Sequence, residues 1–269
     1  MSRKVVLITG GSSGIGKAIG TYLVKRNFIV YGTTRDTSKH ANFDAFPLLQ
    51  LDVCQRNTIT TAVAALLEAE GRIDVLINNA GVGITGPIEE TPNEEILKAF
   101  DTNFNGPIAV IKAVLPQMRK QQKGLVINIT SIAGYMGLPF RGVYSASKGA
   151  LGIVTEALRM ETKEFGVQFT TIAPGDFATN IAAGRYNSPL TETSAYKKTY
   201  GTSLQLINDH VDDGQDPTLV AQLVYKVICT KRPKVHYKVG VFMQKFSVFL
   251  KGILPDKVYE KLLLNHYKL

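Results

Sequence analysis

The chain has 269 residues, of which 45% are hydrophobic and 20% are charged, a balance typical of a folded globular protein and unlike that of a disordered one. The 2 cysteines are too few for a disulfide framework and predict reduced thiols inside a cell, and no apolar run approaches the ~18 residues of a membrane span. The formal net charge of +9 raises the question of nucleic-acid binding.

The positive charge is concentrated at the end of the chain. Residues 231–269 hold nine Lys or Arg side chains and two acidic ones, whereas residues 1–230 carry a net charge of only +2. We therefore expect a nearly neutral body over residues 1–230, a basic tail over residues 231–269, and no nucleic-acid partner. The first residues predict a strand rather than a signal peptide, so a cytoplasmic location is expected.

Short apolar runs rich in β-branched residues alternate with helical periodicity through most of the body. Strands are expected at residues 5–9, 28–33, 48–51, 75–78, 125–129 and 168–173. Helices are expected at residues 14–26, 58–69, 94–118 and 143–165. The alternation predicts parallel βαβ units, and the nearly continuous apolar strands predict a sheet covered on both faces. The expected fold is a single-domain α/β protein, a Rossmann-like doubly wound parallel sheet with helices on both faces.

A glycine-rich turn joins the first expected strand to the first expected helix. Its sequence is Thr9-Gly10-Gly11-Ser12-Ser13-Gly14-Ile15-Gly16. Glycines permit a tight turn and a close approach of ligand to backbone, and the free N–H groups at the helix start attract a pyrophosphate. Because the turn lies between a strand and a helix, it predicts a dinucleotide site formed by Gly10, Ser12, Ser13, Gly14, Ile15 and Gly16.

The end of the second expected strand bears on which dinucleotide binds. An acidic residue there ordinarily takes the ribose 2′-hydroxyl of NAD, but this chain places Thr34 at that position, with Arg35 beside it. A guanidinium suits the 2′-phosphate of NADP, so NADP(H) is the favoured cofactor. NAD(H) stays open, because a shift of one residue would make Asp36 the ribose acid.

Tyr144 and Lys148 are four residues apart in an expected helix and therefore share one face. A free tyrosine has a pKa of ~10 and is a poor base at neutral pH, but a nearby ammonium stabilises the phenolate and is expected to lower that pKa. Ser131, after the fifth expected strand, can hydrogen-bond a substrate oxygen and hold it against the Tyr144 hydroxyl. Because open α/β sheets bind ligands at strand ends, these residues predict a catalytic site.

Further segments at the other expected strand ends and in the long helix complete a pattern. They are Asp52-Val53, Asn78-Asn79-Ala80-Gly81, Asn103 and Pro174-Gly175. With the glycine turn, Ser131 and the segment Tyr144-Ser145-Ala146-Ser147-Lys148, they make the chain resemble the short-chain dehydrogenase/reductase family over residues 4–179. The resemblance implies a doubly wound sheet, a nicotinamide cofactor and interconversion of a carbonyl and an alcohol.

The resemblance also implies roles for single residues. Tyr144 is the implied general acid/base, with Ser131 and Lys148 beside it. Tyr144 and Lys148 also border the cofactor. Asn103 helps place a water that relays protons through Lys148. The other implied cofactor contacts are Asp52 and Val53 at the adenine, Asn79 at a ribose, and Pro174, Gly175, Phe177 and Thr179 near the nicotinamide. Phe177 departs from the small β-branched residue of many relatives, which puts that contact in doubt. Relatives commonly pair two long helices, so a homo-oligomer, a dimer or a tetramer, is expected.

Apolar residues follow the strand ends where a substrate would lie, and they predict a hydrophobic pocket. The expected substrate contacts are Ser131, Tyr144, Val82, Met136 and Leu138, with Ile84, Phe177, Ile181 and Tyr186 as further wall residues. The alternative for the apolar members is that they belong to the core. The polar segment 179–217 breaks the alternation and predicts an irregular insertion or lid.

The tail has the apolar stripe of an amphipathic helix, in two pieces separated by Pro255-Asp256. The stripe consists of Phe242, Phe246, Phe249, Leu250, Ile253 and Leu254, followed by Val258, Tyr259, Leu262 and Leu263. Any surface helix shows such a stripe, so packing on the body or on a partner subunit is the first expectation. Flanking lysines also suit peripheral contact with an anionic membrane, which stays open.

Together these features predict an NADP(H)-dependent enzyme that interconverts a hydrophobic ketone or aldehyde and its alcohol, with a small-molecule substrate and reduction as the favoured direction. The 4 histidines have no metal-ligand spacing, so no metal is expected. Two alternatives remain: an NAD-linked alcohol dehydrogenase, and a non-catalytic dinucleotide-sensing scaffold in which the pair Tyr144 and Lys148 would be dispensable.

Overall fold

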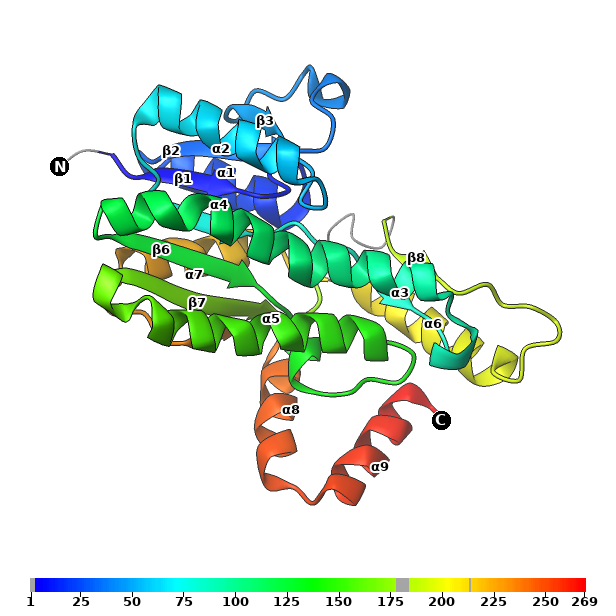
Figure 1. The fold of residues 1–269 in the computed structure, drawn as a ribbon. Helices are drawn as coiled ribbons and strands as arrows, with labels where there is room; N and C mark the ends of the chain where they lie inside the picture. The colour runs from blue at the N-terminus through cyan, green and yellow to red at the C-terminus, as the bar shows by residue number, and fades with distance from the viewer. Residues whose placement is uncertain (1–2, 178–183, 213) are drawn as a thin grey trace.

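Seven parallel strands form the central sheet of the protein (Figure 1). The structure is a computed structural model and describes residues 3–177, 184–212 and 214–269. The strands are ordered β3-β2-β1-β4-β6-β7-β9, and each neighbouring pair is parallel. Their bounds are β1 Val5–Ile8, β2 Ile29–Thr34, β3 Leu48–Gln50, β4 Val75–Asn78, β6 Gly124–Ile129, β7 Val167–Pro174 and β9 His236–Val239. The chain extends the sheet outward from β1 and then from β4, which confirms the doubly wound fold and places a ligand crevice at their carboxyl ends.

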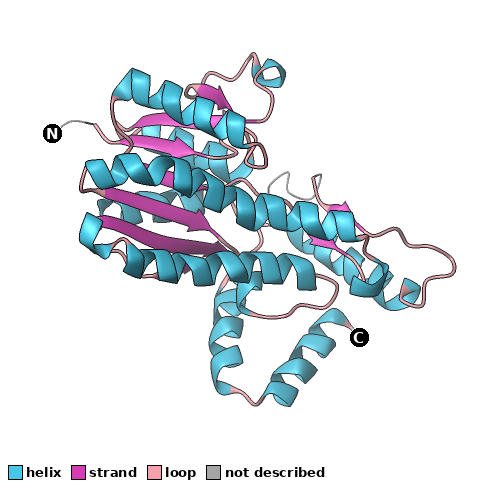
Figure 2. Cartoon of the chain, in the orientation of Figure 1, coloured by secondary structure: helices cyan, strands magenta, loops and turns pink. Residues whose placement is uncertain are grey.

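Helices cover both faces of the sheet, as Figures 1 and 2 show. Helices α1 (Gly14–Val24) and α7 (Thr218–Cys229) pack on one face. The other face is covered by α2 (Arg56–Glu70), α4 (Gly106–Lys120) and α5 (Gly142–Glu161). The molecule therefore has three layers, with the sheet in the middle.

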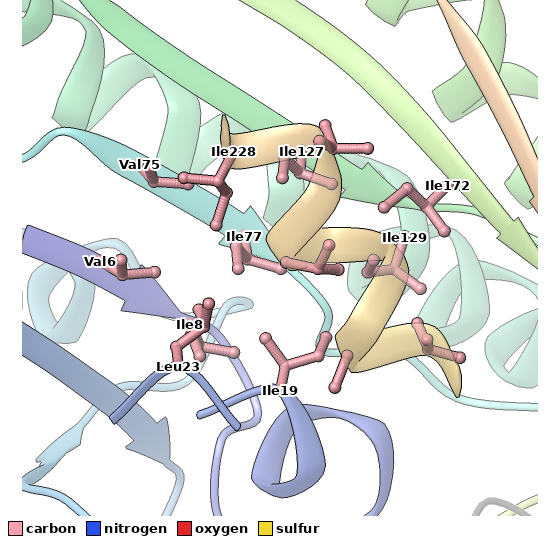
Figure 3. Close-up of a cluster of buried hydrophobic side chains, with 14 of the residues drawn as sticks. Val6, Ile8, Ile19, Leu23, Val75, Ile77, Ile127, Ile129, Ile172 and Ile228 are labelled. Carbon is pink, nitrogen blue, oxygen red and sulfur yellow. The ribbon is translucent and has the colours of Figure 1, made fainter. Parts of the chain in front are cut away.

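Each face of the sheet has its own hydrophobic core, because successive strand side chains point to opposite faces. In β1, Val6 and Ile8 lie in the core under α1 and α7, while Val5 and Leu7 lie in the core under α2 and α4. Figure 3 shows the first core, where branched side chains of β1, β4, β6 and β7 meet the two helices. Burial on both faces fixes the strands and therefore the polar residues that follow them.

The long helix expected at residues 94–118 is interrupted. The structure has α3 over Asn93–Phe100, a π-helical turn over Asp101–Asn105, and then α4. A π turn shifts the hydrogen-bond register of a helix and is frequent at functional sites. This turn contains Asn103, whose side chain is fully buried.

The segment expected to be an irregular lid is only partly irregular. Strand β8 (Tyr186–Asn187) pairs with β5 (Ile84–Thr85), and Lys197–Asp212 forms helix α6. The expectation was wrong for α6 because its buried positions, Tyr200, Ser203 and Ile207, have helical spacing but include a serine, which conceals the apolar stripe. Two residues expected at the site, Thr179 and Ile181, lie outside the described residues.

The tail begins in the sheet and ends as a pair of helices. Strand β9 pairs with β7, although it lies within the range expected to be tail. The two amphipathic pieces form α8 (Phe242–Ile253) and α9 (Asp256–Tyr267), which we call the α8–α9 hairpin, and they are separated at Pro255 as expected. Among the described residues, no helix combines the length and the apolar content needed to cross a bilayer.

Candidate active site

The turn between β1 and α1 is suited to bind an anion. Gly10 and Gly14 have φ angles of +64° and +49°, which glycine adopts without strain, and a β-carbon on Gly16 would lie 2.2 Å from the Gly10 carbonyl oxygen. Ser13 caps α1 without a side-chain hydrogen bond, so the first N–H groups of the helix can bind a phosphate. Asn79 fixes the turn, since its Nδ2 donates to the Gly10 carbonyl oxygen at 3.1 Å.

A cavity of about 670 Å³ extends from this turn along the carboxyl ends of the strands. Among the residues expected at the cofactor, those that line it are Gly10, Ser12, Ser13, Gly14, Ile15, Arg35, Asp52, Val53, Asn79, Tyr144, Lys148, Pro174, Gly175 and Phe177. Gly16 is buried within α1. Backbone N–H groups at a helix start and a guanidinium at the far end match the phosphates of a dinucleotide, so the residues present fit that cofactor. Their individual contacts stay predictions.

At the end of β2, the basic and acidic side chains have different surroundings. Arg35 is exposed and lines the cavity together with Thr34. The Asp36 carboxylate accepts hydrogen bonds from the Ser38 N–H at 3.0 Å and the Ser38 hydroxyl at 2.6 Å, and it lies 3.8 Å from the Lys39 ammonium. The bonds from Ser38 hold the pKa of Asp36 below its ordinary value. Asp36 is therefore engaged within its own turn, while Arg35 borders the cavity.

Three of the predicted catalytic residues lie together in the cavity. Tyr144 and Lys148 are one turn apart on α5, and both line the cavity with Ser131, which follows β6. The Lys148 ammonium donates to the carbonyl oxygen of Ile129 at 3.1 Å, which connects α5 to the end of β6. The site thus combines a hydroxyl that can give up a proton, a second hydroxyl that can orient a substrate oxygen, and a buried cation.

Asn103 lies behind this group. Its Oδ1 accepts from the Val82 N–H and its Nδ2 donates to the Val82 carbonyl oxygen, both at 2.9 Å, and Nδ2 also donates to the Ser147 hydroxyl at 3.1 Å. A β-carbon on Gly81 would lie 3.0 Å from both Asn103 Oδ1 and Lys148 Nζ, so glycine at this position leaves room for the two groups. The relay of protons through Lys148 stays a prediction.

Burial sets the charge states of the two central groups. It raises the pKa of the Tyr144 hydroxyl above its ordinary value, against the opposing effects of the Arg141 guanidinium and a hydrogen bond with Ser131. Burial also lowers the pKa of Lys148 from 10.5 to about 8. We expected Lys148 to lower the pKa of Tyr144, but the net effect of the protein is to raise it. The loss of hydration destabilises the phenolate more than nearby cations stabilise it. Tyr144 is therefore protonated at neutral pH, as a proton donor must be.

The apolar residues expected at the substrate divide into two groups. Val82 and Ile84 line the cavity with Ser131 and Tyr144. Met136, Leu138 and Tyr186 are not among the described residues that line the cavity. Met136 and Leu138 pack with the α8–α9 hairpin, and Tyr186 packs beside Ile84.

Sequence reasoning missed three charged residues that line the cavity near Tyr144: Arg141, Asp176 and Arg185. The Arg141 guanidinium lies 5.4 Å from the centre of the Tyr144 ring, and one Nη of Arg185 donates to the Asn208 side chain at 3.2 Å. Arg141 precedes Tyr144 by about one helical turn and Asp176 directly follows Pro174-Gly175, so their positions could have been found. Nothing in the polar lid sequence pointed to Arg185.

The α8–α9 hairpin holds two of these charged residues, Asp176 and Arg141, from the other side. Gln244 of α8 donates to the Asp176 carboxylate at 2.6 Å and accepts from the Asp176 N–H at 3.3 Å. On α9, the Tyr259 hydroxyl donates to the Met136 sulfur at 2.8 Å, and the buried Tyr267 is hydrogen-bonded to Arg141. The hairpin therefore lies behind the wall of the cavity and holds two of its lining residues.

Comparison with known proteins matches the chain to a family model described as short chain dehydrogenase, over residues 4–189. The chain is 38% identical over 268 residues to a 3-ketodihydrosphingosine reductase of Bacteroides thetaiotaomicron, and the match covers 99% of each chain. The family model ends before the α8–α9 hairpin, but the match to the Bacteroides relative extends over it, so the similarity is not confined to the nucleotide-binding half.

Solved structures share the fold. A short-chain dehydrogenase from Streptomyces avermitilis has a TM-score of 0.84 at 33% identity, covering 99% of this chain and 97% of its own. ElxO with NADP bound has a TM-score of 0.73 at 25% identity, with 88% and 97% covered. A Burkholderia phymatum enzyme in complex with NAD has a TM-score of 0.75 at 25% identity, with 87% and 89% covered. Structural neighbours therefore bind either dinucleotide.

We predict that Lys148→Met makes the protein more stable at pH 7 by about 3 kcal/mol, because the buried ammonium has a lowered pKa. Below pH 8 both the folded and unfolded chains hold the proton and the burial penalty is complete. As pH rises from about 8 to 10.5, the folded chain loses the proton first, so the wild type gains stability and the difference shrinks. Urea unfolding of both proteins between pH 7 and 9.5 measures this trend.

The matched control is Lys112→Met, which removes an exposed lysine of α4 and should change stability little at either pH. A Lys148→Met protein less stable than the wild type across the pH range would contradict the prediction and show that the bond to Ile129 outweighs the burial penalty.

Proposed function

The chain belongs to the short-chain dehydrogenase/reductase family, and on that premise we propose that it reduces the carbonyl group of a lipophilic ketone or aldehyde with NADPH. The observation that supports this best is the meeting of Tyr144, Ser131 and Lys148 in one cavity with an anion-binding turn. When bound, the nicotinamide supplies the hydride. The remaining tasks, which are orienting the carbonyl and protonating its oxygen, belong to the chain's own residues.

The geometry assigns a task to each side chain. The Ser131 hydroxyl can donate a hydrogen bond to the carbonyl oxygen and place it against Tyr144, which gives its proton to that oxygen as negative charge develops. The Lys148 ammonium, one turn along α5, stabilises the phenolate that remains. The raised pKa of Tyr144 supports reduction as the direction, because the hydroxyl rather than the phenolate is its resting form.

NADP(H) is the proposed cofactor, with NAD(H) as the rival. The support is the arrangement at the end of β2, where Arg35 and the neutral Thr34 line the cavity. The Asp36 carboxylate, which would have to take a ribose hydroxyl in an NAD enzyme, is bonded to Ser38. A guanidinium in this place favours a phosphate over a hydroxyl.

For the substrate, we propose a long-chain ketone with an amino group beside the carbonyl, the chemistry of the compound for which the Bacteroides relative is named. Asp176 supports this class, since it is a carboxylate at the substrate end of the cavity. Gln244 bonds to one of its oxygens and thereby orients it. A carboxylate oriented in this way can bind an ammonium close to the carbonyl that Tyr144 protonates.

The second candidate substrate is an anionic carbonyl compound, and the two arginines favour it. Arg141 and Arg185 both line the cavity, and each affects the Tyr144 hydroxyl electrostatically. Burial lowers the pKa of Arg185, which indicates a partly desolvated guanidinium that an anion would stabilise. We rank the anionic substrate second because the Arg185 guanidinium already has a hydrogen-bond partner in Asn208.

We also propose a cytoplasmic location, with peripheral membrane contact through the tail, and a homo-oligomer formed through α4 and α5. Two large apolar residues on α5 support the oligomer, because the side chains of Ile153 and Met160 are 71% and 72% exposed. Exposed apolar side chains on a long helix are typical of a helix that packs on a partner.

We predict that Arg35→Ala weakens NADPH binding by roughly 10- to 100-fold and leaves NADH binding unchanged, because only the phosphate uses a charge-assisted hydrogen bond. Titration of each cofactor by intrinsic fluorescence quenching or calorimetry measures both constants. Lys39→Ala is the control, since this exposed lysine lies beside Asp36 in the same turn. Equal loss for both cofactors, or a wild type that binds NADH more tightly, would favour the NAD-linked alternative.

We predict that Asp176→Asn raises KM for a long-chain 2-amino-3-ketone by roughly 10- to 100-fold, because the carboxylate charge is lost while the shape is kept. The N-acetylated ketone, which has no charge, is the matched substrate and should be turned over equally by both proteins. An equal rise in KM for both substrates would show that Asp176 does not bind the ammonium and acts only by shaping the loop after β7. A preference for keto acids that disappears in Arg185→Gln would establish the second candidate instead.

A further inference from the structure

The α8–α9 hairpin has two faces, and the body covers only one of them. The inner face of α8 packs with Ile132 and Ala173 of the body through Val248, Leu250 and Leu254. The outer face has a stripe of large apolar residues at spacings of four, three and four, which places them on one side of the helix. This outer stripe consists of Phe242, Phe246, Phe249 and Ile253.

Three of the four residues of the outer stripe are exposed, and Phe246 is half-buried between them. Phe242, Phe249 and Ile253 are 70%, 58% and 59% exposed, and none of the residues of α8 is buried. The rings of the phenylalanines stack on one another, with centroids 5.5 Å apart for Phe242 and Phe246 and 5.9 Å apart for Phe246 and Phe249. A continuous aromatic surface of this kind is seldom left in water and marks an interaction site.

Exposed lysines accompany the stripe. Lys245 is on α8, and Lys257 and Lys261 are on α9 beside the exposed Val258 and Leu262. Asp256 is paired with Lys251 at 2.9 Å, and Glu260 is the second acidic residue, so the hairpin keeps a net charge of +2 from its four lysines. Apolar side chains flanked by lysines that keep their ammonium groups in water are the pattern of a helix that lies in a lipid headgroup layer.

We propose that the outer stripe docks on a bilayer that contains anionic lipids. Figure 1 shows α8 and α9, in orange and red, projecting from the body away from the three layers, so that a flat surface can reach them. A second copy of the chain fits less well, because a two-fold contact through the same face would bring the lysines of both copies together. A bilayer with negative headgroups instead attracts each lysine by about 1 kcal/mol.

The helices that carry the outer stripe also contact residues that line the catalytic cavity. While the outer stripe faces the lipid, Gln244 and Tyr267 on the same hairpin hold Asp176 and Arg141 at the substrate end of the cavity. Helix α9 also contacts α6 of the lid segment. Resting on the proposed function, the consequence is that a long-chain substrate can reach the cavity from the bilayer; the docking itself does not depend on turnover.

The test is co-sedimentation of the full-length protein with vesicles of phosphatidylcholine alone or with 30% phosphatidylglycerol. We expect at least tenfold stronger binding to the anionic vesicles. Phe242→Gln/Phe249→Gln should lose at least tenfold, because two exposed aromatic contacts are removed. Lys257→Gln/Lys261→Gln should lose roughly tenfold on anionic vesicles and nothing on neutral ones.

The matched control is Ile88→Gln/Leu97→Gln, two residues each 64% exposed on another part of the body, which should bind vesicles like the wild type. Wild-type protein that stays in the supernatant, or phenylalanine variants that bind unchanged, would overturn the proposal. A dimer that the phenylalanine variants dissociate would show that a second copy covers the stripe. Turnover of a short water-soluble ketone should be equal in all these proteins, so failure of docking and failure of the proposed reaction are separable.

Discussion

The hydrogen bond from the Lys148 ammonium to the Ile129 carbonyl oxygen connects the catalytic helix to the sheet, and the geometry of the site depends on that connection. It fixes α5 at the carboxyl end of β6, so that Tyr144 and Ser131, which lies two residues after the strand, line the same cavity. A second polar chain, from Asn78 to Asn128 to Thr155, joins β4, β6 and α5 at 2.9 and 2.8 Å. Buried polar groups of this kind are stable only when paired, so they allow one placement of α5.

Other elements of the chain complete the site around α5. The π turn between α3 and α4 brings Asn103 to Ser147 of α5, and the turn after β1 offers N–H groups to a phosphate. The α8–α9 hairpin supports the substrate end, where Gln244 holds Asp176 and Tyr267 holds Arg141. A single pair of helices thereby serves the chemistry with its inner face and, in our proposal, a lipid surface with its outer face.

Local spacing was enough to predict six of the seven strands of the sheet, the glycine turn and the Tyr144–Lys148 pair, because each depends on residues close in sequence; strand β9, in the basic tail, was missed. Contacts between distant residues were not predictable: Gln244 meets Asp176 across 68 positions, and Arg185 reaches the cavity from a polar lid. Helix α6 was missed because Ser203 interrupts its stripe. The charge state of Tyr144 was also misjudged, since burial, which a sequence does not display, outweighs nearby cations.

The central claim is that hydride reaches the carbonyl carbon while Tyr144 protonates the oxygen. The most direct measurement is mass spectrometry of the alcohol formed from a long-chain amino ketone and NADPH deuterated at the transferable position. The account predicts one deuterium on the carbinol carbon, and a rate at least ~100-fold lower in Tyr144→Phe with NADPH binding retained. A Tyr144→Phe protein with the wild-type rate, or an alcohol without deuterium, would contradict it.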